Sequence, residues 1–223
     1  AGEVVERRLA HGHRGPRGGS CLATAGNLNN HLGVPLTLLR LEPSHRAAVI
    51  EIGANRAGEV AALVEVARPT IGLITNAGAE HLEGFGSLDG VARAEGEMVA
   101  GLARNATAII NADDTYAAMW RSMTAARVVT FGLGAGADVR ASQPDFGVDE
   151  RGFVTRFTLH SPQGSVAIEL ALAGRHNVLN ALCAAAAAQA AGASLADIAG
   201  GLGAMRAVGG RLQFRRTTGG AWL

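Results

Sequence analysis

Lysine is missing from this sequence: all 20 of the residues counted as lysine or arginine are arginine. The absence excludes catalysis through a lysine Schiff base or a lysine general base. It also excludes a phosphate-binding loop of the Walker type, which ends in Gly-Lys-Ser or Gly-Lys-Thr. We attribute the arginine excess to codon bias in a GC-rich genome, a hypothesis that a source genome of low GC content would contradict.

Net charge, aromatic residues and cysteine are also scarce. With a formal charge of +1 and 4% aromatic residues, the chain lacks the basic patches and stacking platforms of a nucleic-acid-binding protein. Its two cysteines, Cys21 and Cys183, lie in apolar stretches typical of small buried thiols. No apolar run reaches the roughly 18 residues of a membrane span, and no export signal is recognisable. We therefore expect a cytoplasmic protein with no nucleic-acid partner and no membrane span.

Familiar catalytic motifs are absent as well. The sequence has no Gly-x-Ser-x-Gly, His-Glu-x-x-His or Cys-x-x-Cys motif. It therefore lacks the motifs that usually indicate a serine hydrolase, a zinc protease or a structural zinc module. His81-Leu82-Glu83 fits only the first half of a zinc deaminase signature. Residues 132–137 imitate a dinucleotide fingerprint, but strand-like residues follow them, so we interpret them as a loop between two sheets.

Strand-like and helix-like runs alternate through the first part of the chain. We expect strands at 21–25, 47–52, 71–75, 107–111 and 127–131, and helices at 31–41, 57–67, 87–103 and 114–123. Such alternation favours right-handed crossovers and a mainly parallel, doubly wound sheet flanked by helices. A helical pattern at 3–10 and a Gly/Arg-rich loop at 11–19 precede it.

The pattern changes in the second half. Residues 138–142, 153–160 and 165–172 are strand-like, and the turn at 161–164 predicts an antiparallel hairpin between the last two. Helices return at 177–191 and 195–205. The sequence thus predicts an α/β fold with a mainly parallel, doubly wound sheet and a smaller antiparallel sheet in the second half.

Two residues with metal-binding side chains follow successive strands. Glu51 ends the strand at 47–52, and His81 lies in the loop after the strand at 71–75. Taken alone, Glu51 is more typical of a surface carboxylate at a strand end, and His81 of an ordinary loop histidine. Ligands bind outside the carboxyl ends of parallel strands, so two neighbouring strands would aim both side chains at one place. We therefore predict a phosphate-bound Mg²⁺ site there.

Four sequence blocks carry a family resemblance. They are Thr24-Ala25-Gly26-Asn27-Leu28-Asn29-Asn30 with Gly33-Val34-Pro35, Glu51-Ile52-Gly53-Ala54-Asn55, the run from Asn76 to Gly86, and Gly174-Arg175-His176-Asn177 with Asn180-Ala181. Through them the chain resembles the central domain of the Mur ligase family. The resemblance implies a central ATPase domain at 21–212, an N-terminal remnant at 1–20 and a truncated tail at 213–223.

The first and third blocks favour the branch of the family that joins D-alanyl-D-alanine to UDP-N-acetylmuramoyl-tripeptide in peptidoglycan synthesis. The resemblance implies that ATP phosphorylates the carboxylate of the tripeptide and that the amine of D-alanyl-D-alanine attacks the acyl phosphate. Charge builds on phosphate oxygens, so positioning and electrostatic stabilisation matter more than a nucleophile. Glu51 and His81 would each hold a Mg²⁺ ion, with ATP and Mg²⁺ as cofactors.

The resemblance also implies roles for polar residues around this centre. Four would contact the sugar-nucleotide substrate: Thr24, Asn27, Asn29 and Asn30. Four would bind ATP: Asn76, Asn177, Asn180 and Arg211. The alternatives are turn formation for the loop asparagines, a helix N-cap for Asn177, and a solvated arginine at Arg211, where glycine replaces the usual preceding proline.

One candidate ligand departs from the family pattern. Where this sequence has Glu95, many members have a lysine that reacts with CO₂ to form a carbamate ligand of Mg²⁺. A glutamate presents a carboxylate without modification. We therefore expect Glu95 to replace the carbamate as a catalytic metal ligand beside Glu51 and His81, and the alternative is a helix-surface charge.

Missing parts limit what we expect of the isolated chain. No Gly-Lys-Thr phosphate loop precedes Thr24, and the uridine-binding and C-terminal domains of the family have no counterpart in the sequence. We expect an inactive fragment of an ATP-dependent amide ligase. The alternative is a non-catalytic remnant that binds UDP-muramoyl peptide or a partner protein.

Overall fold

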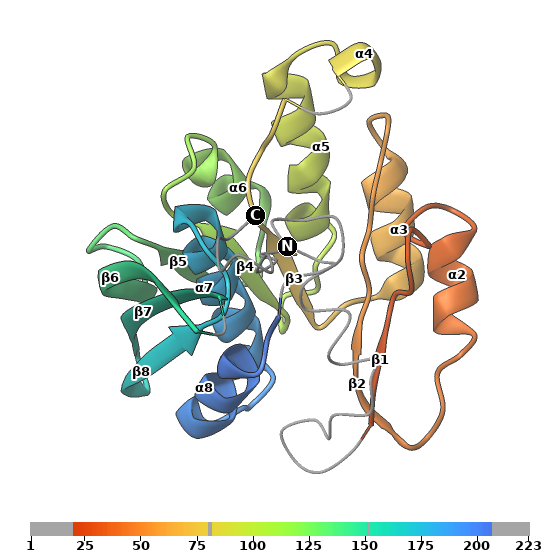
Figure 1. The fold of residues 1–223 in the computed structure, drawn as a ribbon. Coiled ribbons are helices and arrows are strands. Elements are labelled where there is room, and N and C mark those ends of the chain that lie inside the picture. Colours follow the sequence, from red (N-terminus) through yellow and green to blue (C-terminus); the bar gives the residue numbers. More distant parts are fainter. Residues whose placement is uncertain (1–19, 80–81, 151, 207–223) are drawn as a thin grey trace, which may run out of the picture.

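Two β-sheets organise the part of the chain that this computed structural model describes, residues 20–79, 82–150 and 152–206. The small sheet pairs β1 (Ser20–Ala23) with β2 (His45–Val49), and the large sheet has six strands in the order β3, β4, β5, β6, β7, β8. Figure 1 shows the small sheet at one side of the molecule and the large sheet at the other.

The large sheet is parallel in one part and antiparallel in the other. Its strands are β3 (Ile71–Ile74), β4 (Thr107–Asn111), β5 (Arg127–Gly132), β6 (Val139–Asp149), β7 (Gly152–Ser161) and β8 (Gly164–Leu170). The pairs from β3 to β6 are parallel, and β6, β7 and β8 pair antiparallel. The carboxyl ends of β3, β4 and β5 therefore share one edge of the sheet.

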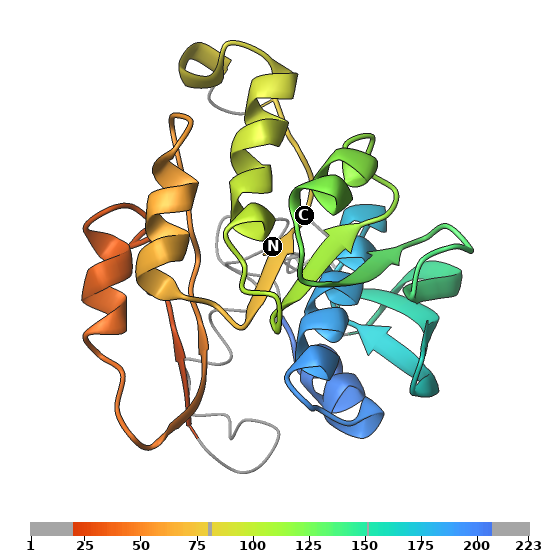
Figure 2. The same cartoon turned by 180° about the vertical axis from the view of Figure 1, so that it is seen from behind.

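Helices cover both faces of the large sheet (Figure 2). On one face lie α5 (Leu88–Ala100) and α6 (Ala117–Met123), and on the other α7 (Arg175–Ala190) and α8 (Leu195–Gly203). Strand β4 faces both layers because successive side chains point to opposite faces. Ala108 and Ile110 pack in the core beneath α5 and α6, whereas Ile109 packs in the core beneath α7 and α8.

Helix α7 approaches the sheet through small side chains. Ala181, Ala185 and Ala186 are buried in the core that α7 shares with β4 to β8. Alanine side chains lose no rotamer freedom on burial and let a helix lie close to its neighbours. The run of five alanines at residues 184–188 therefore serves packing.

The small sheet carries two helices of its own, α2 (Gly33–Leu38) and α3 (Glu59–Ala67). Helix α3 packs against α5, where Gly101 leaves room for Val64: a Cβ added at Gly101 would lie 2.7 Å from a Val64 methyl group. Among the described residues, β2 pairs only with β1, and β3 pairs only with β4. The predicted adjacency of the strands that lead to Glu51 and His81 is therefore wrong, because strand order depends on contacts remote in sequence.

The predicted α/β class is confirmed, with two differences in detail. The antiparallel strands extend the parallel sheet, since Phe131 and Gly132 pair with Val139 and Arg140, so the loop at 133–138 joins two strands of one sheet. Strand β6 also runs beyond the predicted end at residue 142, past an irregularity in pairing at 142–145. The predicted hairpin at 161–164 is confirmed.

Some expectations fall outside the described residues, namely the helix at 3–10 and the loop at 11–19. Within the described ranges, no helix has the length and apolar character needed to span a membrane.

Candidate functional site

A hydrogen-bond network at the carboxyl ends of β1 and β2 holds Glu51. The hydroxyl of Thr24, which is fully buried, accepts a hydrogen bond from the Glu51 backbone N–H at 2.9 Å. The side-chain amide of Asn29 donates to Glu51 Oε1 at 2.8 Å, and the backbone carbonyl oxygen of Asn29 accepts from the Gly53 N–H at 2.8 Å. The Glu51 side chain is half-buried. Three predicted site residues thus form one unit around a carboxylate that solvent can reach.

The other asparagines of the first block differ from Asn29. Asn30 Oδ1 accepts hydrogen bonds from the backbone N–H groups of Leu32 and Gly33, at 3.0 and 2.9 Å. This is the turn formation that asparagine side chains favour, and it orders the chain before α2. Asn27 is exposed beside Gly26. Both asparagines are exposed, and Asn30 uses its side-chain oxygen in the turn before α2.

A second polar network lies at the carboxyl ends of β3 and β4. The Asn111 side-chain amide donates to the carbonyl oxygen of Thr75 at 2.8 Å. Asp114 Oδ2 accepts from the Ala77 N–H at 3.0 Å. These bonds tie the loop of the exposed Asn76 to the adjacent strand.

The Asp113 carboxylate, which follows β4, ties down the loop after β5. Its carboxylate accepts hydrogen bonds from the backbone N–H groups of Leu133 and Gly134, at 2.6 and 3.1 Å. The sequence pattern did not single out Asn111, Asp113 and Asp114 as site residues, because Asn111 is typical of the end of a strand and Asp114 of the start of a helix. Their position after a buried parallel strand was the signal that could have revealed them.

The loops of the two sheets meet at α4 (Leu82–Phe85) and α5. A side chain at Gly84 would collide with the carbonyl oxygen of Asn55, so α4 lies against the loop that follows Glu51. Both views show α4 beside the segment that joins β2 to α3 (Figures 1 and 2). On α5, Glu97 accepts hydrogen bonds from the N–H groups of Gly58 and Ala61.

The predicted metal ligands are only partly described. Glu95 lies on α5 and is half-buried. His81 and Arg211 lie outside the described residues. In the part of the chain that is described, no group of three or more His, Cys, Asp or Glu side chains could hold a metal ion. The trio of Glu51, His81 and Glu95 therefore stays a prediction.

The predicted ATP-binding asparagines of α7 are inside the helix. Gly174 is the N-cap residue, with φ at 92°, and the helix begins at Arg175. The proposed N-cap role of Asn177 is therefore wrong, because glycine takes the positive φ that ends the preceding loop. The Asn177 amide donates to the carbonyl oxygen of Ala173 at 2.7 Å. Asn180, one turn later, is half-buried.

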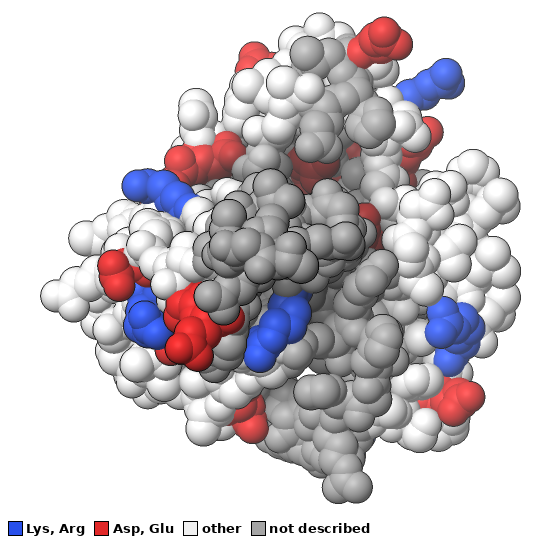
Figure 3. All heavy atoms as spheres, viewed as in Figure 1, with Lys and Arg blue, Asp and Glu red and all other residues white. Residues whose placement is uncertain are grey.

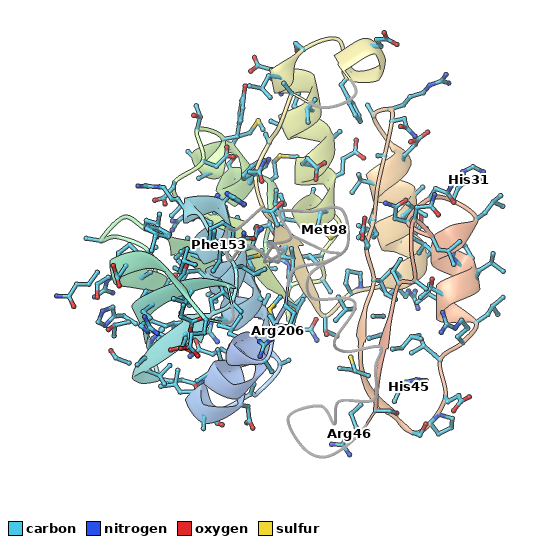
Figure 4. The ribbon with its side chains drawn as sticks, in the orientation of Figure 1. His31, His45, Arg46, Met98, Phe153 and Arg206 are labelled. Carbon is cyan, nitrogen blue, oxygen red and sulfur yellow. The ribbon has the colours of Figure 1, made fainter. Side chains whose placement is uncertain are left out.

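Other candidate groups lie away from this edge or are unreactive. Figure 3 shows acidic and arginine side chains interspersed on the visible face. His31 and His45 lie on the small-sheet side (Figure 4), and His45, at the opposite end of β2 from Glu51, accepts a hydrogen bond from the Glu42 N–H. Cys21 and Cys183 are buried free thiols, as predicted. Burial raises the pKa of Cys183 to about 12, which keeps it a neutral thiol.

Comparison with known families identifies the fold. The family model of the Mur ligase middle domain matches residues 7–188 of this chain. The chain belongs to the Mur ligase family. As a Mur ligase chain it brings together the polar residues of its first two blocks, Thr24, Asn29 and Glu51, in one hydrogen-bond network.

Relatives within the Mur ligase family are similar over most of this chain. The UDP-N-acetylmuramoyl-tripeptide--D-alanyl-D-alanine ligase of Escherichia coli (strain K12) is 48% identical over 194 residues, which are 87% of this chain and 42% of that ligase. A crystal structure of MurF from Acinetobacter baumannii has a TM-score of 0.88 and 36% identity, covering 98% of this chain and 47% of that one.

A MurF ligase from Thermotoga maritima, solved in complex with ADP, shares the fold. Its TM-score is 0.80 at 22% identity, with 98% of this chain and 48% of that chain covered. The present chain spans about two fifths of the length of curated relatives that it matches, such as the E. coli ligase at 42%.

Proposed function

We propose that this chain is the central domain of an ATP-dependent ligase that adds D-alanyl-D-alanine to UDP-N-acetylmuramoyl-tripeptide in the cytoplasm. The observation that carries the proposal is the network of Thr24, Asn29 and Glu51, which fixes a carboxylate at the carboxyl end of β2. Of the two oxygens of this carboxylate, only Oε1 receives a hydrogen bond from a described residue. Family membership and the identity to the E. coli ligase support the choice of reaction.

The chemistry of the candidate ligands fits a magnesium phosphate cluster. Carboxylate oxygens are hard ligands that Mg²⁺ prefers, and Glu51 and Glu95 would supply them, with His81 as a nitrogen ligand. Bound Mg²⁺ would neutralise the negative charge that develops on phosphate oxygens. We propose that Glu95 takes the place of the carbamylated lysine of other family members.

Residues hydrogen-bonded to the candidate ligands and to their loops would prepare the site. Asn29 holds one oxygen of Glu51 and so fixes the direction of the other. Asn111 and Asp114 hold the loop that presents Asn76, and Asp113 holds the loop after β5. Such preorganisation lowers the reorganisation required when charge moves in the transition state. The polar edge of the large sheet would thereby form the ATP side of the site.

The remaining polar residues fall into two groups. Thr24, Asn27, Asn29 and Asn30 would lie toward the sugar-nucleotide substrate. Of these, Asn27 and Asn30 are exposed, and the oxygen of the Asn30 amide is already bonded in the turn before α2, so Asn27 is suited to direct contact. Asn177 and Asn180 on α7, together with Arg211, would lie toward the nucleotide. The amine substrate, D-alanyl-D-alanine, would attack the acyl phosphate formed from ATP and the muramoyl tripeptide.

A chimeric enzyme tests the proposed function. The matching stretch of the E. coli ligase is replaced by that of this chain, and ADP release is measured with Mg²⁺, ATP, UDP-N-acetylmuramoyl-tripeptide and D-alanyl-D-alanine. We expect release that depends on D-alanyl-D-alanine, and a fall in kcat of about 100-fold in Glu51→Gln, because the proposed Mg²⁺ at the reacting phosphates loses a carboxylate ligand. Glu65→Gln, an exposed change on α3, is the matched control.

The same assay separates the alternatives. A folded chimera that binds UDP-N-acetylmuramoyl-tripeptide but releases no ADP would favour the non-catalytic remnant. Glu95→Gln is expected to lower kcat and to raise the Mg²⁺ concentration required for half-maximal rate. Unchanged kinetics in Glu95→Gln would identify this residue as a helix-surface charge.

A further inference from the structure

Helix α3 begins without a cap from its own sequence. Its N-cap residue is Gly58, with φ at 85°, and a glycine has no side chain to accept a hydrogen bond from the first turn. The first N–H groups of an α-helix have no partner within the helix and need acceptors from elsewhere. A serine, threonine or aspartate at the N-cap normally supplies one.

Glu97 of α5 supplies these acceptors from a different helix. Its Oε1 accepts from the Gly58 N–H at 2.7 Å, and its Oε2 accepts from the Ala61 N–H at 3.0 Å. Ala61 is the third residue of α3, so both N–H groups that a capping box satisfies are bonded by one carboxylate. The negative charge also lies at the positive end of the helix dipole, where hydrogen bonds to an ionised group are strong.

The start of α3, which Glu97 holds, is also the end of the loop that leads from Glu51. Residues 52–58 connect Glu51 to α3, and within them the Asn55 N–H is bonded to the carboxylate of Glu59 at 2.8 Å. Among the described residues, the small sheet shares no strand pairing with the large one. The contact between α3 and α5, together with that of α4 with Asn55, therefore sets where Glu51 lies relative to the large sheet.

We propose that Glu97 is a positioning residue that fixes the Glu51 carboxylate relative to the part of the site on α5 and the large sheet. The inference rests on the proposed function. It also separates two neighbouring acidic residues of α5: Glu95 is a candidate metal ligand, whereas both oxygens of Glu97 are bonded to the backbone of α3.

Hydrogen exchange on the full 223-residue chain tests the clamp itself. In Glu97→Ala, we expect the amides of Gly58 and Ala61 to exchange at least about tenfold faster, because their acceptors are lost. Glu97→Gln keeps one acceptor oxygen and should give a smaller increase. Glu65→Gln, on the exposed side of α3, should leave both amides unchanged.

Kinetics of the chimeric ligase test the positioning role. Glu97→Ala is expected to lower kcat about tenfold and to raise the Mg²⁺ concentration for half-maximal rate. The reason is that a small displacement of the Glu51 carboxylate would misplace the proposed Mg²⁺ relative to the reacting phosphate. The KM for D-alanyl-D-alanine should stay unchanged, and Glu97→Gln should recover part of the loss. A purely structural role would lower the melting temperature without shifting the Mg²⁺ dependence.

The two experiments fail in different ways. Unchanged exchange at Gly58 and Ala61 in Glu97→Ala would overturn the clamp. Faster exchange with an unshifted Mg²⁺ dependence, in a chimera that Glu51→Gln inactivates, would overturn the positioning role and leave the proposed function standing. A chimera that tolerates Glu51→Gln would overturn the proposed function and with it the positioning role, whatever the exchange shows.

Discussion

The two sheets hold their polar residues in different ways. In the small sheet, the site residues bond one another, as Thr24 and Asn29 bond Glu51. In the large sheet, Asn111 and Asp114 bond the backbone of the loop beyond a neighbouring strand. The large sheet therefore builds a rigid edge across several strands, whereas the small sheet offers one well-oriented carboxylate. The small unit depends on α3 and α5 for its placement.

The largest expected change in the free energy of unfolding tests whether the large sheet with its helices contributes more to stability than the small sheet with its helices. Trp120 is fully buried beneath the large sheet, and its indole N–H donates to the Ala92 carbonyl oxygen at 2.8 Å. Trp120→Ala should lower the free energy of unfolding by about 3–5 kcal/mol. Val34→Ala, at a fully buried position near the small sheet, should lower it by roughly 2 kcal/mol. Urea unfolding measures both, and equal losses would contradict the comparison.

A matched pair of threonines tests where the function lies. Thr24 and Thr155 are both fully buried; Thr24 accepts from the Glu51 N–H, and Thr155 donates to the Leu172 carbonyl oxygen. Each change to valine should lower the free energy of unfolding by about 1–3 kcal/mol, because a buried polar group loses its partner. Only Thr24→Val should also lower kcat of the chimeric ligase. A similar kinetic loss in Thr155→Val would show that the antiparallel end takes part in the site.

The smallest effect concerns α8, at the end of the large sheet farthest from β3. Ser194 and Asp197 form a capping box there, and the Ser194 hydroxyl and backbone N–H bonds lower the pKa of Asp197 below 3.8. Ser194→Ala should lower the free energy of unfolding by about 1 kcal/mol at neutral pH.

The pH dependence of that effect has a definite sign. Because the pKa of Asp197 is lower in the folded chain, its contribution is present above the ordinary value of 3.8 and is lost as the pH falls through the folded pKa. The difference between Ser194→Ala and the parent should therefore shrink in acid. Urea unfolding at pH 7 and below pH 3.8 measures it, and a difference that grows in acid would contradict the assignment.

Local patterns predicted most of the fold and part of the site. Strand-like runs followed by helical ones gave the α/β class, since side-chain periodicity is a property of short segments. The same logic placed Glu51 at the carboxyl end of the strand expected at 47–52, and the structure has Glu51 just beyond Val49, where β2 ends. The rule also applied to Asn111 and Asp114, but Asn111 was assigned to a strand and Asp114 to the start of a helix.

Contacts between distant segments could not be predicted in this way. The bonds of Glu97 join residues 36 and 39 positions apart, and no periodic pattern records such a pair. Sheet order is equally non-local, which is why β2 and β3 were wrongly expected to be neighbours. The N-cap of α7 was misplaced by three residues because glycine and asparagine both suit helix ends.

The alanine side chains of α7 have a consequence for evolution at this site. A helix seated on methyl groups leaves no slack, so a single larger residue at Ala181 or Ala185 would lift it from the strands beneath. The displacement would travel along the helix axis to Asn177 and Asn180. Mutational drift at these alanines is thus constrained by the proposed nucleotide side of the protein as well as by its interior.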